Sequence, residues 1–262
     1  MAETLVSRRT EDGIMVLELD APPANTYSYE MMRQLDDAIL AARMDDAVHV
    51  LVLRGAGETF FSAGADIRML KTVTPRFKYS FCLHANETLN RLEQTPKLVI
   101  AALNGHTVGG GFEIALAADL RVARRNGGKI GLPEVTLGVL PGTGGTQRLA
   151  RLVGQARALE LMATGRTMSF DEAAALGLVT HVFEPQNWWD AVLAYARQFC
   201  PPGKAAKAVG LIKRSVVSGG AIPFLEALAL ERELQQQLFE SDDAREGLDA
   251  YLEKRPPRFR GV

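Results

Sequence analysis

Two glutamates beside glycine-bearing turns are the residues of this sequence best suited to chemistry. Glu113 follows the three glycines of "VGGGFE" (108–113), and Glu134 follows Pro133, which suits a first helical position, in "GLPEV" (131–135). A carboxylate is costly to bury unless something pairs with it or uses it. Two carboxylates that converge on one reacting centre could serve as a general acid and a general base. Each could equally be a helix-start acid that complements the helix dipole, and the spacing alone leaves both interpretations open.

The glycines before Glu113 favour a site for a negatively charged group. A strand expected over 98–103 runs through Asn104 and Gly105 into the glycine triplet, and a helix is expected from near Phe112. Glycine lets a ligand approach the backbone closely, and the first N–H groups of a helix point outward without partners. This geometry suits a phosphate or a developing oxyanion. The sequence lacks the Lys-Ser/Thr of a P-loop and the spacing of a dinucleotide-binding turn, so a phosphate site is the weaker interpretation.

A second turn of small residues follows another expected strand, over 48–54. It contains "SAGA" (62–65) and leads toward a helical segment that ends near residue 70. In α/β sheets, ligands bind outside the carboxyl ends of the strands. Tight turning alone could explain either loop. Together the two loops could each offer one backbone N–H to a single carbonyl oxygen.

Composition and charge exclude several classes of protein. The chain has 262 residues, of which 47% are hydrophobic and 23% charged, and its 30 Lys and Arg nearly cancel its 31 Asp and Glu. No global field therefore favours nucleic acid or an anionic membrane. Cys82 and Cys200 have neither disulfide-framework nor metal-ligand spacing. With no apolar signal segment and no apolar run of about 20 residues, we expect a cytoplasmic protein.

Alternating apolar runs and helical patterns predict an α/β protein. The run over 14–19 joins the two strands named above as a buried strand. Helical spacing predicts a helix from Met31 to Ala42 with Ser28 as its cap, and a second from Phe77 to Leu92. After residue 145 the pattern is mostly helical. The expected helices there cover 169–178 (capped by Ser169), 187–200, 204–218, 223–239 and a last segment from Ser241 to before Pro256.

The motifs together resemble the crotonase, or enoyl-CoA hydratase/isomerase, superfamily over nearly the whole chain. No single motif is decisive, but their order and spacing are specific. They are "FFSAGADI" (60–67), "NGHTVGGGFEIALAADLRVA" (104–123), "GLPEVTLGVLPGTGGTQRL" (131–149), "AAALGLV" (173–179) and "DDAREGLDAYLEKRPPRF" (242–259). The resemblance implies a spiral of ββα units over residues 1–200, which holds an acyl-CoA site. It implies a helical C-terminal region over 201–262 for trimerisation, with a homotrimer or homohexamer as the assembly.

The resemblance also implies roles for individual residues. The backbone N–H groups of Ala65 and Gly110 would hold the thioester carbonyl of an acyl-CoA. Glu113 would accept a proton from the attacking water, Glu134 would protonate C2, and Gly142 would help to fix the water and Glu134. The CoA channel would be lined by Ala63, Asp66, Ile67 and Arg68. Arg68 would meet a CoA phosphate, as would Lys254 from a neighbouring subunit, although an exposed Arg or Lys is more often a solvated charge.

The implied reaction is hydration. Family hydratases keep both glutamates, as this chain does, whereas isomerases usually work with only the later acid. We therefore expect reversible addition of water across the C2=C3 bond of a trans-2-enoyl-CoA to give a 3-hydroxyacyl-CoA. No metal and no separate cofactor is expected, because the CoA thioester itself activates the alkene.

Three alternatives remain open at this point. One is a Δ3–Δ2 enoyl-CoA isomerase. Another is a hydratase or dehydratase of a specialised acyl-CoA such as 3-methylglutaconyl-CoA, which the "EKRPPRF" tail resembles. The last is a CoA- or RNA-binding homologue without catalysis. The chain also has Asn25-Thr26-Tyr27 where family hydratases often have Asn-Ala-Leu, which leaves the acyl preference undetermined.

Other chemically capable residues are expected to be structural. His106 is predicted to be a polar turn residue, and Asp119 to stabilise the end of a helix. Trp188 and Trp189 are expected to contribute to packing.

Overall fold

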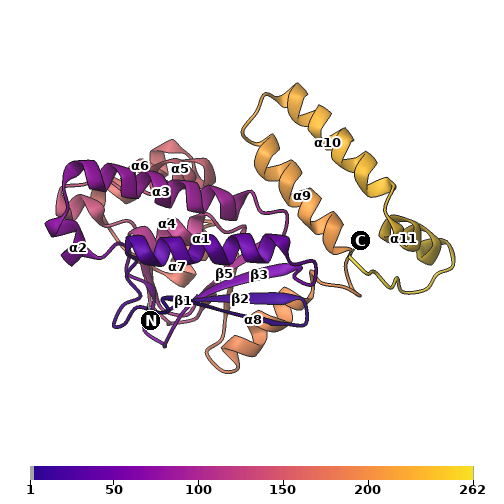
Figure 1. Cartoon of the computed structure of the whole chain (residues 1–262), viewed down its shortest axis with the longest axis horizontal. Helices are drawn as coiled ribbons and strands as arrows, with labels where there is room; N and C mark the ends of the chain where they lie inside the picture. The colour runs from indigo at the N-terminus through magenta and orange to yellow at the C-terminus, as the bar shows by residue number, and fades with distance from the viewer. Residues whose placement is uncertain (1–2, 262) are drawn as a thin grey trace.

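A computed structural model describes residues 3–261 as an α/β core with a helical arm at one end (Figure 1). The strands are β1 Val6–Glu11, β2 Ile14–Leu19, β3 Val50–Gly55, β4 Phe60–Ser62, β5 Leu98–Leu103, β6 His106–Val108, β7 Leu120–Arg124, β8 Lys129–Gly131, β9 Met168–Ser169 and β10 His181–Phe183. The helices are α1 Tyr29–Met44, α2 Ile67–Thr72, α3 Pro75–Glu93, α4 Gly110–Leu116, the 3-10 helix η1 Glu134–Leu137, α5 Gly145–Val153, α6 Gln155–Thr164, α7 Phe170–Ala175, α8 Trp188–Arg197, α9 Ala206–Gly219, α10 Phe224–Phe239 and α11 Asp242–Leu252.

The strands form two sheets, and the chain passes repeatedly from one sheet to the other. The larger sheet has the order β1-β2-β3-β5-β7-β10, and the smaller has β4-β6-β8-β9. β3, β5 and β7 belong to the first sheet, and each is followed by a strand of the second sheet and then by a helical segment. This is the spiral of ββα units that the resemblance implies. Since β4, β6 and β8 are parallel neighbours, their carboxyl ends lie along one edge.

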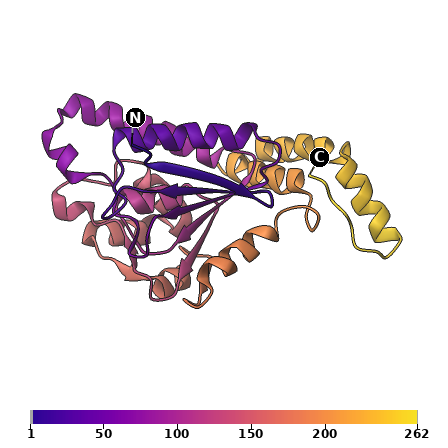
Figure 2. The same ribbon diagram turned by 60° about the horizontal axis from the view of Figure 1, so that its bottom comes forward.

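The central strands β2, β3 and β5 of the larger sheet are buried on both faces, as their continuous apolar runs predict. Leu17, Leu51 and Leu53 point toward the side packed by α1, α3 and α4. Val16 and Val52 point toward the opposite side, which α8 covers with its buried Trp188 and Val192. Figure 2 shows the strands between these two helical layers. The expected packing of Trp188 is confirmed, and Trp189 packs partly buried beside it.

Local sequence signals fix several helix starts. Ser28 caps α1 by accepting the N–H of Met31 at 3.2 Å, and Ser169 caps α7 by accepting the N–H of Glu172 at 3.2 Å. Thr74 caps α3, which has Pro75 at its first position, where a missing N–H is tolerated. The caps predicted at Ser28 and Ser169 are thus confirmed, because each depends only on side-chain chemistry close by in the sequence.

The short strands β4 and β6 to β10 were not expected from the sequence, and three further details also differ. β1 was not expected, because Val6 is the only one of its six residues that is buried. α4 begins at Gly110 and not near Phe112. Pro133 precedes η1 and does not occupy its first position. The last two differences are of one or two residues, as is usual for helix boundaries.

The helical arm begins with α9, which is fixed to the core by a buried ion pair. Lys213 Nζ lies 2.9 Å from Asp119 Oδ2 and donates to the Lys97 carbonyl oxygen at 3.1 Å. Asp119 also accepts the N–H of Val99 at 2.7 Å. Asp119 is thus structural, but its side chain joins β5 and α9 and does not bond to the helix end where it was expected to act. α10 packs along α9, and α11 extends away from the core (Figures 1 and 2). The division near residue 200 stays a prediction.

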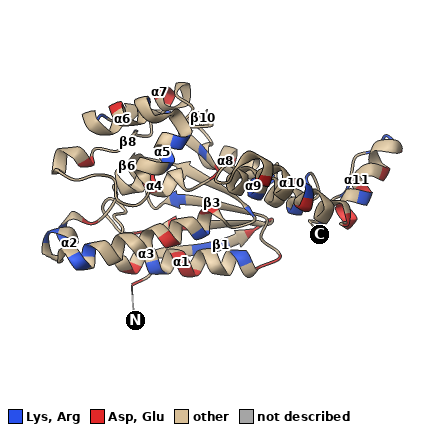
Figure 3. Cartoon of the chain, turned by 90° about the horizontal axis from the view of Figure 1, so that it is seen from above, with Lys and Arg blue, Asp and Glu red and all other residues tan. Residues whose placement is uncertain are grey.

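Charged side chains of both signs are interspersed along the outer helices, as Figure 3 shows for α1, α3 and the arm. Among residues 3–261, none of the helices has both the length and the apolar character needed to cross a membrane.

Candidate active site

Three loops meet where β4, β6 and β8 end. The loop after β4 contains Gly64, with φ +90°, and the loop after β6 contains Gly109, with φ +57°. A Cβ atom at Gly64 would lie 2.8 Å from the backbone N of Gly110, and a Cβ at Gly111 would lie 2.1 Å from the carbonyl oxygen of Ser62. The two turns of small residues therefore lie directly against each other, and glycine is what permits the approach.

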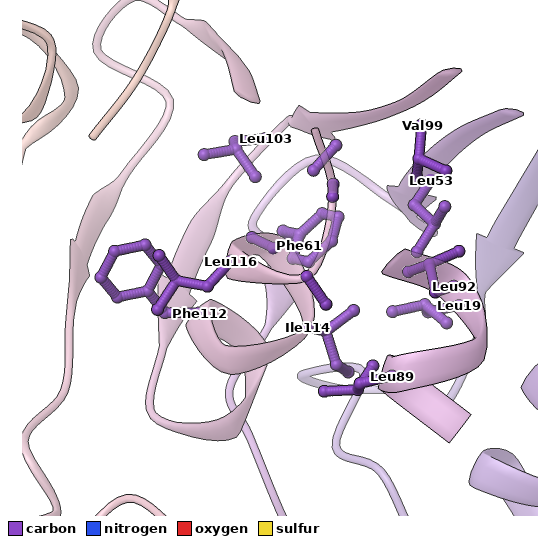
Figure 4. Packing of buried hydrophobic residues seen from close by; sticks show 14 of the residues in the cluster. Leu19, Leu53, Phe61, Leu89, Leu92, Val99, Leu103, Phe112, Ile114 and Leu116 are labelled. Atoms are coloured by element: carbon purple, nitrogen blue, oxygen red, sulfur yellow. The ribbon is translucent and has the colours of Figure 1, made fainter. Parts of the chain in front are cut away.

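Helix α4 is held rigidly by its apolar side chains. Every residue from Gly110 to Leu116 is buried. Phe112, Ile114 and Leu116 belong to the same buried cluster as Phe61 and Leu89, and Figure 4 shows Ile114 near Leu89 and Phe112 beside Leu116. No side chain of the described residues caps the helix at Gly109, and the N–H of Gly110 has no acceptor within the helix. That amide is available to an external oxygen, where the helix dipole adds positive potential.

The backbone of Ala65 offers a second amide. Ala65 forms a parallel bridge with Tyr27 in which Tyr27 donates to Gly64 O at 2.9 Å and accepts the N–H of Asp66 at 3.1 Å. In a parallel bridge the central residue directs its own N–H to the other side. The N–H of Ala65 thus points away from the Tyr27 backbone.

Glu113 is a buried carboxylate with fixed hydrogen-bond donors. Its side chain lies in the first turn of α4, and the residue is 2% exposed. Oε1 accepts the N–H groups of Thr143 and Gly145, each at 2.7 Å. Burial raises the pKa of Glu113 above its usual value, although these two N–H groups and Thr143 oppose the shift. Glu113 thus lies in the first turn of a helix, as one interpretation predicted. Its side chain, however, accepts hydrogen bonds from Thr143 and Gly145 and not from the helix.

Glu134 approaches the same place from η1. Its Oε1 would lie 3.2 Å from a Cβ atom at Gly109. Its Oε2 is buried and has no hydrogen-bond partner among residues 3–261. Burial first, and the charge of Glu113 as well, raise the pKa of Glu134 to about 7, although Lys78 on α3 opposes the shift.

The two carboxylates are therefore unequal. Neighbouring carboxylates tend to share a proton, since both cannot ionise easily at close range. Glu113 has two N–H donors that stabilise its charge, whereas the free Oε2 of Glu134 suits a protonated oxygen. The backbone N–H groups of Ala65 and Gly110 lie beside these glutamates and point away from their own segments. Such a site can stabilise an oxyanion while one group accepts a proton and another donates one.

The remaining residues predicted for the site lie in the loop after β4, on α2, just before Thr143 and after α11. Asp66 caps α2 by accepting the N–H of Arg68 at 2.9 Å, and Ile67 and Arg68 are exposed on that helix, while Ala63 precedes Gly64 in the loop. Gly142 O accepts a bond from Asn86 Nδ2 at 3.3 Å, at the start of the segment that clamps Glu113. Lys254 follows α11, which lies at the opposite end of the molecule from α2 (Figure 1), so one chain does not bring it to the site.

Several residues of the site were not predicted from the sequence. Thr143 and Gly145 hold Glu113 through backbone N–H groups, which the glycine-rich "GTGG" (142–145) could have indicated. Tyr27 and Lys78 come from distant segments and carry no local motif.

His106 was expected in a turn but begins β6, where its Nδ1 accepts the N–H of Lys129 at 3.2 Å. Among residues 3–261, His, Cys, Asp and Glu form no group of three or more suited to a metal ion.

Known proteins resemble this chain over nearly its whole length. The family described as enoyl-CoA hydratase/isomerase matches residues 9–262. The short-chain-enoyl-CoA hydratase of Clostridium acetobutylicum is 37% identical over 94% of this chain and 93% of its own length. The mitochondrial methylglutaconyl-CoA hydratase of Rattus norvegicus is 36% identical over 95% of this chain and 80% of its own length.

A solved structure shares the fold closely. The crystal structure of an enoyl-CoA hydratase from Geobacillus kaustophilus HTA426 matches with a TM-score of 0.97 and 45% sequence identity. The match covers 100% of this chain and 98% of that one.

Proposed function

Since this chain belongs to the enoyl-CoA hydratase/isomerase family, we propose that the two unequal glutamates and the two glycine turns carry out its hydratase reaction. The enzyme is a lyase that adds water reversibly across the C2=C3 bond of a trans-2-enoyl-CoA to give a 3-hydroxyacyl-CoA. The observation that carries the assignment of roles is the contrast between Glu113, which accepts two N–H groups, and Glu134, whose Oε2 is buried and unpartnered among the described residues.

The oxyanion forms at the thioester carbonyl. When water attacks C3, electrons of the C2=C3 bond move toward the carbonyl oxygen, which gains negative charge. The amides of Ala65 and Gly110 donate hydrogen bonds to that oxygen. They are held in place before the reaction by the contact between the two glycine turns. Losing one preorganised donor of this kind typically costs about 3 kcal/mol of the barrier.

The two glutamates move the protons. Glu113 accepts one proton from the attacking water, whose oxygen bonds to C3. Glu134 donates its proton to C2. The product gains the hydroxyl of the water at C3 and a hydrogen at C2, and the pair ends with the proton on Glu113 and the charge on Glu134. Return of that proton to Glu134 through water restores the starting state. General acid–base catalysis of this kind is worth roughly 10²- to 10⁴-fold.

The CoA portion would lie along the loop after β4. Ala63, Asp66, Ile67 and Arg68 line this path in the proposal, and Arg68, exposed on α2, would pair with a CoA phosphate. Lys254 would reach a CoA phosphate only in a neighbouring subunit, which its distance from α2 supports (Figure 1). The proposal includes a homotrimeric or homohexameric enzyme, located in the cytoplasm, that needs no metal and no separate cofactor.

Two acyl groups are candidates for the substrate. A short linear enoyl group is favoured by the likeness to the short-chain-enoyl-CoA hydratase. A branched dicarboxylic group, 3-methylglutaconyl, is favoured by the nearly equal likeness to the methylglutaconyl-CoA hydratase. The cation of Lys78, which acts electrostatically on both glutamates, is placed where it could also attract an acyl carboxylate.

A steady-state assay tests the proposal. The purified protein is mixed with crotonyl-CoA and, separately, with 3-methylglutaconyl-CoA. Loss of the conjugated enoyl-thioester absorbance is followed, and the product mass is determined. A gain of one water with crotonyl-CoA supports the linear substrate, and a preference for 3-methylglutaconyl-CoA supports the branched one. No hydration of either, or a product of unchanged mass with a moved double bond, would contradict the proposal.

A further inference from the structure

Tyr27 is a buried phenol that contacts all three segments of the proposed site. It lies between β2 and α1 and is 2% exposed. A buried tyrosine hydroxyl normally has a hydrogen-bond partner. The sequence has Tyr27 where family hydratases often have leucine, and the reaction scheme above assigns it no role.

The backbone of Tyr27 fixes the loop that carries Ala65. Its N–H donates to Gly64 O at 2.9 Å, and its carbonyl oxygen accepts the N–H of Asp66 at 3.1 Å. The Asn25 side chain holds this segment in turn, since its Nδ2 donates to Ala56 O and to Phe60 O, each at 3.0 Å. The Ala65 amide is therefore oriented by a pair of hydrogen bonds from one residue.

The ring of Tyr27 packs against the loop that carries the other amide. A Cβ atom at Gly110 would lie 2.4 Å from both Cε1 and the hydroxyl oxygen of Tyr27. On another side, the ring of Phe81 lies 5.8 Å away between centroids. The ring edge thus limits how far Gly110 can move toward it, and only glycine fits at that position.

The hydroxyl of Tyr27 contacts Thr143, one of the two residues whose backbone N–H groups donate to Glu113. Its oxygen lies 3.0 Å from Thr143 Oγ1, and the Thr143 N–H donates to Glu113 Oε1 at 2.7 Å. Burial and the charge of Glu113 raise the pKa of Tyr27, so the phenol keeps its proton. The Tyr27 hydroxyl therefore holds the residue whose backbone N–H donates to the Glu113 carboxylate.

We infer that Tyr27 is a positioning residue that holds both oxyanion amides and the Glu113 carboxylate in one arrangement, through its backbone, its ring edge and its hydroxyl. This inference rests on the proposed function. Tyr27 touches no reacting atom in this scheme. Its hydroxyl holds Thr143, whose N–H stabilises the charged state of Glu113, the state that accepts a proton from water.

Substitutions that remove single hydroxyl groups test the connection from Tyr27 through Thr143 to Glu113. Tyr27→Phe removes the phenol oxygen and keeps the ring, Thr143→Val removes the second hydroxyl, and Thr143→Ser restores it. Tyr195→Phe is the matched control, because Tyr195 packs against His181 and Phe199 beside the apolar cluster that contains Trp188, on the other side of the larger sheet. For each variant, kcat and KM with the enoyl-CoA that the wild type hydrates are measured across pH, together with the melting temperature.

A positioning role of Tyr27 predicts a specific combination of changes in kcat, KM and pH dependence. Tyr27→Phe lowers kcat up to about tenfold with KM within about twofold of wild type, as expected for the loss of one buried hydrogen bond between neutral groups. The acidic limb of the pH profile moves up by about half a unit, because the Thr143 N–H is held less firmly against Glu113. Lys78 and Cys82 of α3 and Glu134 of η1 also face this cluster and are unchanged in every variant.

Thr143 variants complete the cycle. Thr143→Val reproduces both effects, the double variant is no worse than the poorer single one, and Thr143→Ser and Tyr195→Phe stay close to wild type. An active wild type with an unaltered Tyr27→Phe overturns the inference alone. So does a Tyr27→Phe that loses melting temperature or raises KM while the acidic limb stays in place. A wild type that hydrates no enoyl-CoA overturns the proposed function and this inference together.

Discussion

At the scale of single residues, the donors around each carboxylate distinguish the acid from the base. Glu113 Oε1 accepts two backbone N–H groups at 2.7 Å. Glu134 has a buried oxygen without a partner among the described residues and a pKa raised to about 7. Pairs of titratable groups whose surroundings separate their pKa values commonly divide acid and base duties. Similar side chains thus acquire different functions from their local contacts.

Amide replacements of the two glutamates should stop turnover while the fold persists. Glu113→Gln and Glu134→Gln each remove one proton-transfer group, and we expect kcat to fall roughly 10²- to 10⁴-fold. In Glu113→Gln the new amide oxygen can still accept the N–H groups of Thr143 and Gly145, so folding should be intact. Steady-state kinetics and circular dichroism check both statements. Near-normal turnover by either folded variant would remove that residue from the proposed scheme.

The pH dependence of hydration follows from the protonation states. The reaction needs Glu113 charged and Glu134 protonated. Because the pKa of Glu134 is about 7, kcat/KM for hydration should fall as pH rises above about 7, which reports the free enzyme. Dehydration needs the same pair with its proton on Glu113, so its profile should have the same limbs. A hydration rate that continues to rise at pH values of about 9 would contradict Glu134 as the donor.

At the scale of elements, the site depends on strands that end side by side. β4, β6 and β8 are parallel neighbours, and the residues proposed for the oxyanion hole and the acid–base pair follow them in turn. The helices after them begin at glycines or within tight turns. The approach of Gly64 to Gly110 is closer than any side chain would allow.

Alanine substitutions at two glycines should separate backbone strain from loss of the site. Gly64 and Gly57 both have positive φ, at +90° and +72°. A Cβ at Gly64 would meet the Gly110 nitrogen at 2.8 Å, whereas a Cβ at Gly57 meets nothing within 4 Å. Both variants should lose about 1 kcal/mol of stability from strain. Only Gly64→Ala should also lower kcat at least tenfold, since it displaces an oxyanion amide.

Melting curves and kinetics of the two glycine variants give the comparison. Equal activity of folded Gly64→Ala and Gly57→Ala would show that the contact between the two turns does not serve catalysis.

Elements with strong local signals were predictable from the sequence, and contacts between distant segments were not. β2, β3 and β5 are apolar on both faces, and Ser28 and Ser169 cap their helices through their own side chains. β1 was missed because its sequence is mostly polar. Glu113 and Glu134 were found because glycine turns mark them. Tyr27 and Thr143 meet across 116 residues of sequence, and no local pattern encodes such a contact.

At the scale of the whole molecule, the arm presents apolar side chains that the chain itself does not cover. Phe224 and Leu225 at the start of α10 are 74% and 75% exposed, and Tyr251 and Leu252 at the end of α11 are also exposed. Exposed apolar groups gathered on one part of a protein commonly mark an interface. The site would depend on such an interface if Lys254 reaches the CoA of a neighbouring subunit, as proposed above.

The oligomeric state should therefore depend on α10. Each large apolar side chain buried between subunits contributes about 1.5–3 kcal/mol, so Leu225→Asp should dissociate a trimer that the wild type forms. Leu159→Asp is the matched control, because Leu159 is 66% exposed on α6, at the opposite end of the molecule from the arm (Figure 1). Light scattering after size-exclusion chromatography measures the mass of each. If dissociation also raises KM for the acyl-CoA while Leu159→Asp does not, Lys254 acts across subunits. A monomeric wild type with full activity would instead show that one chain holds the complete site.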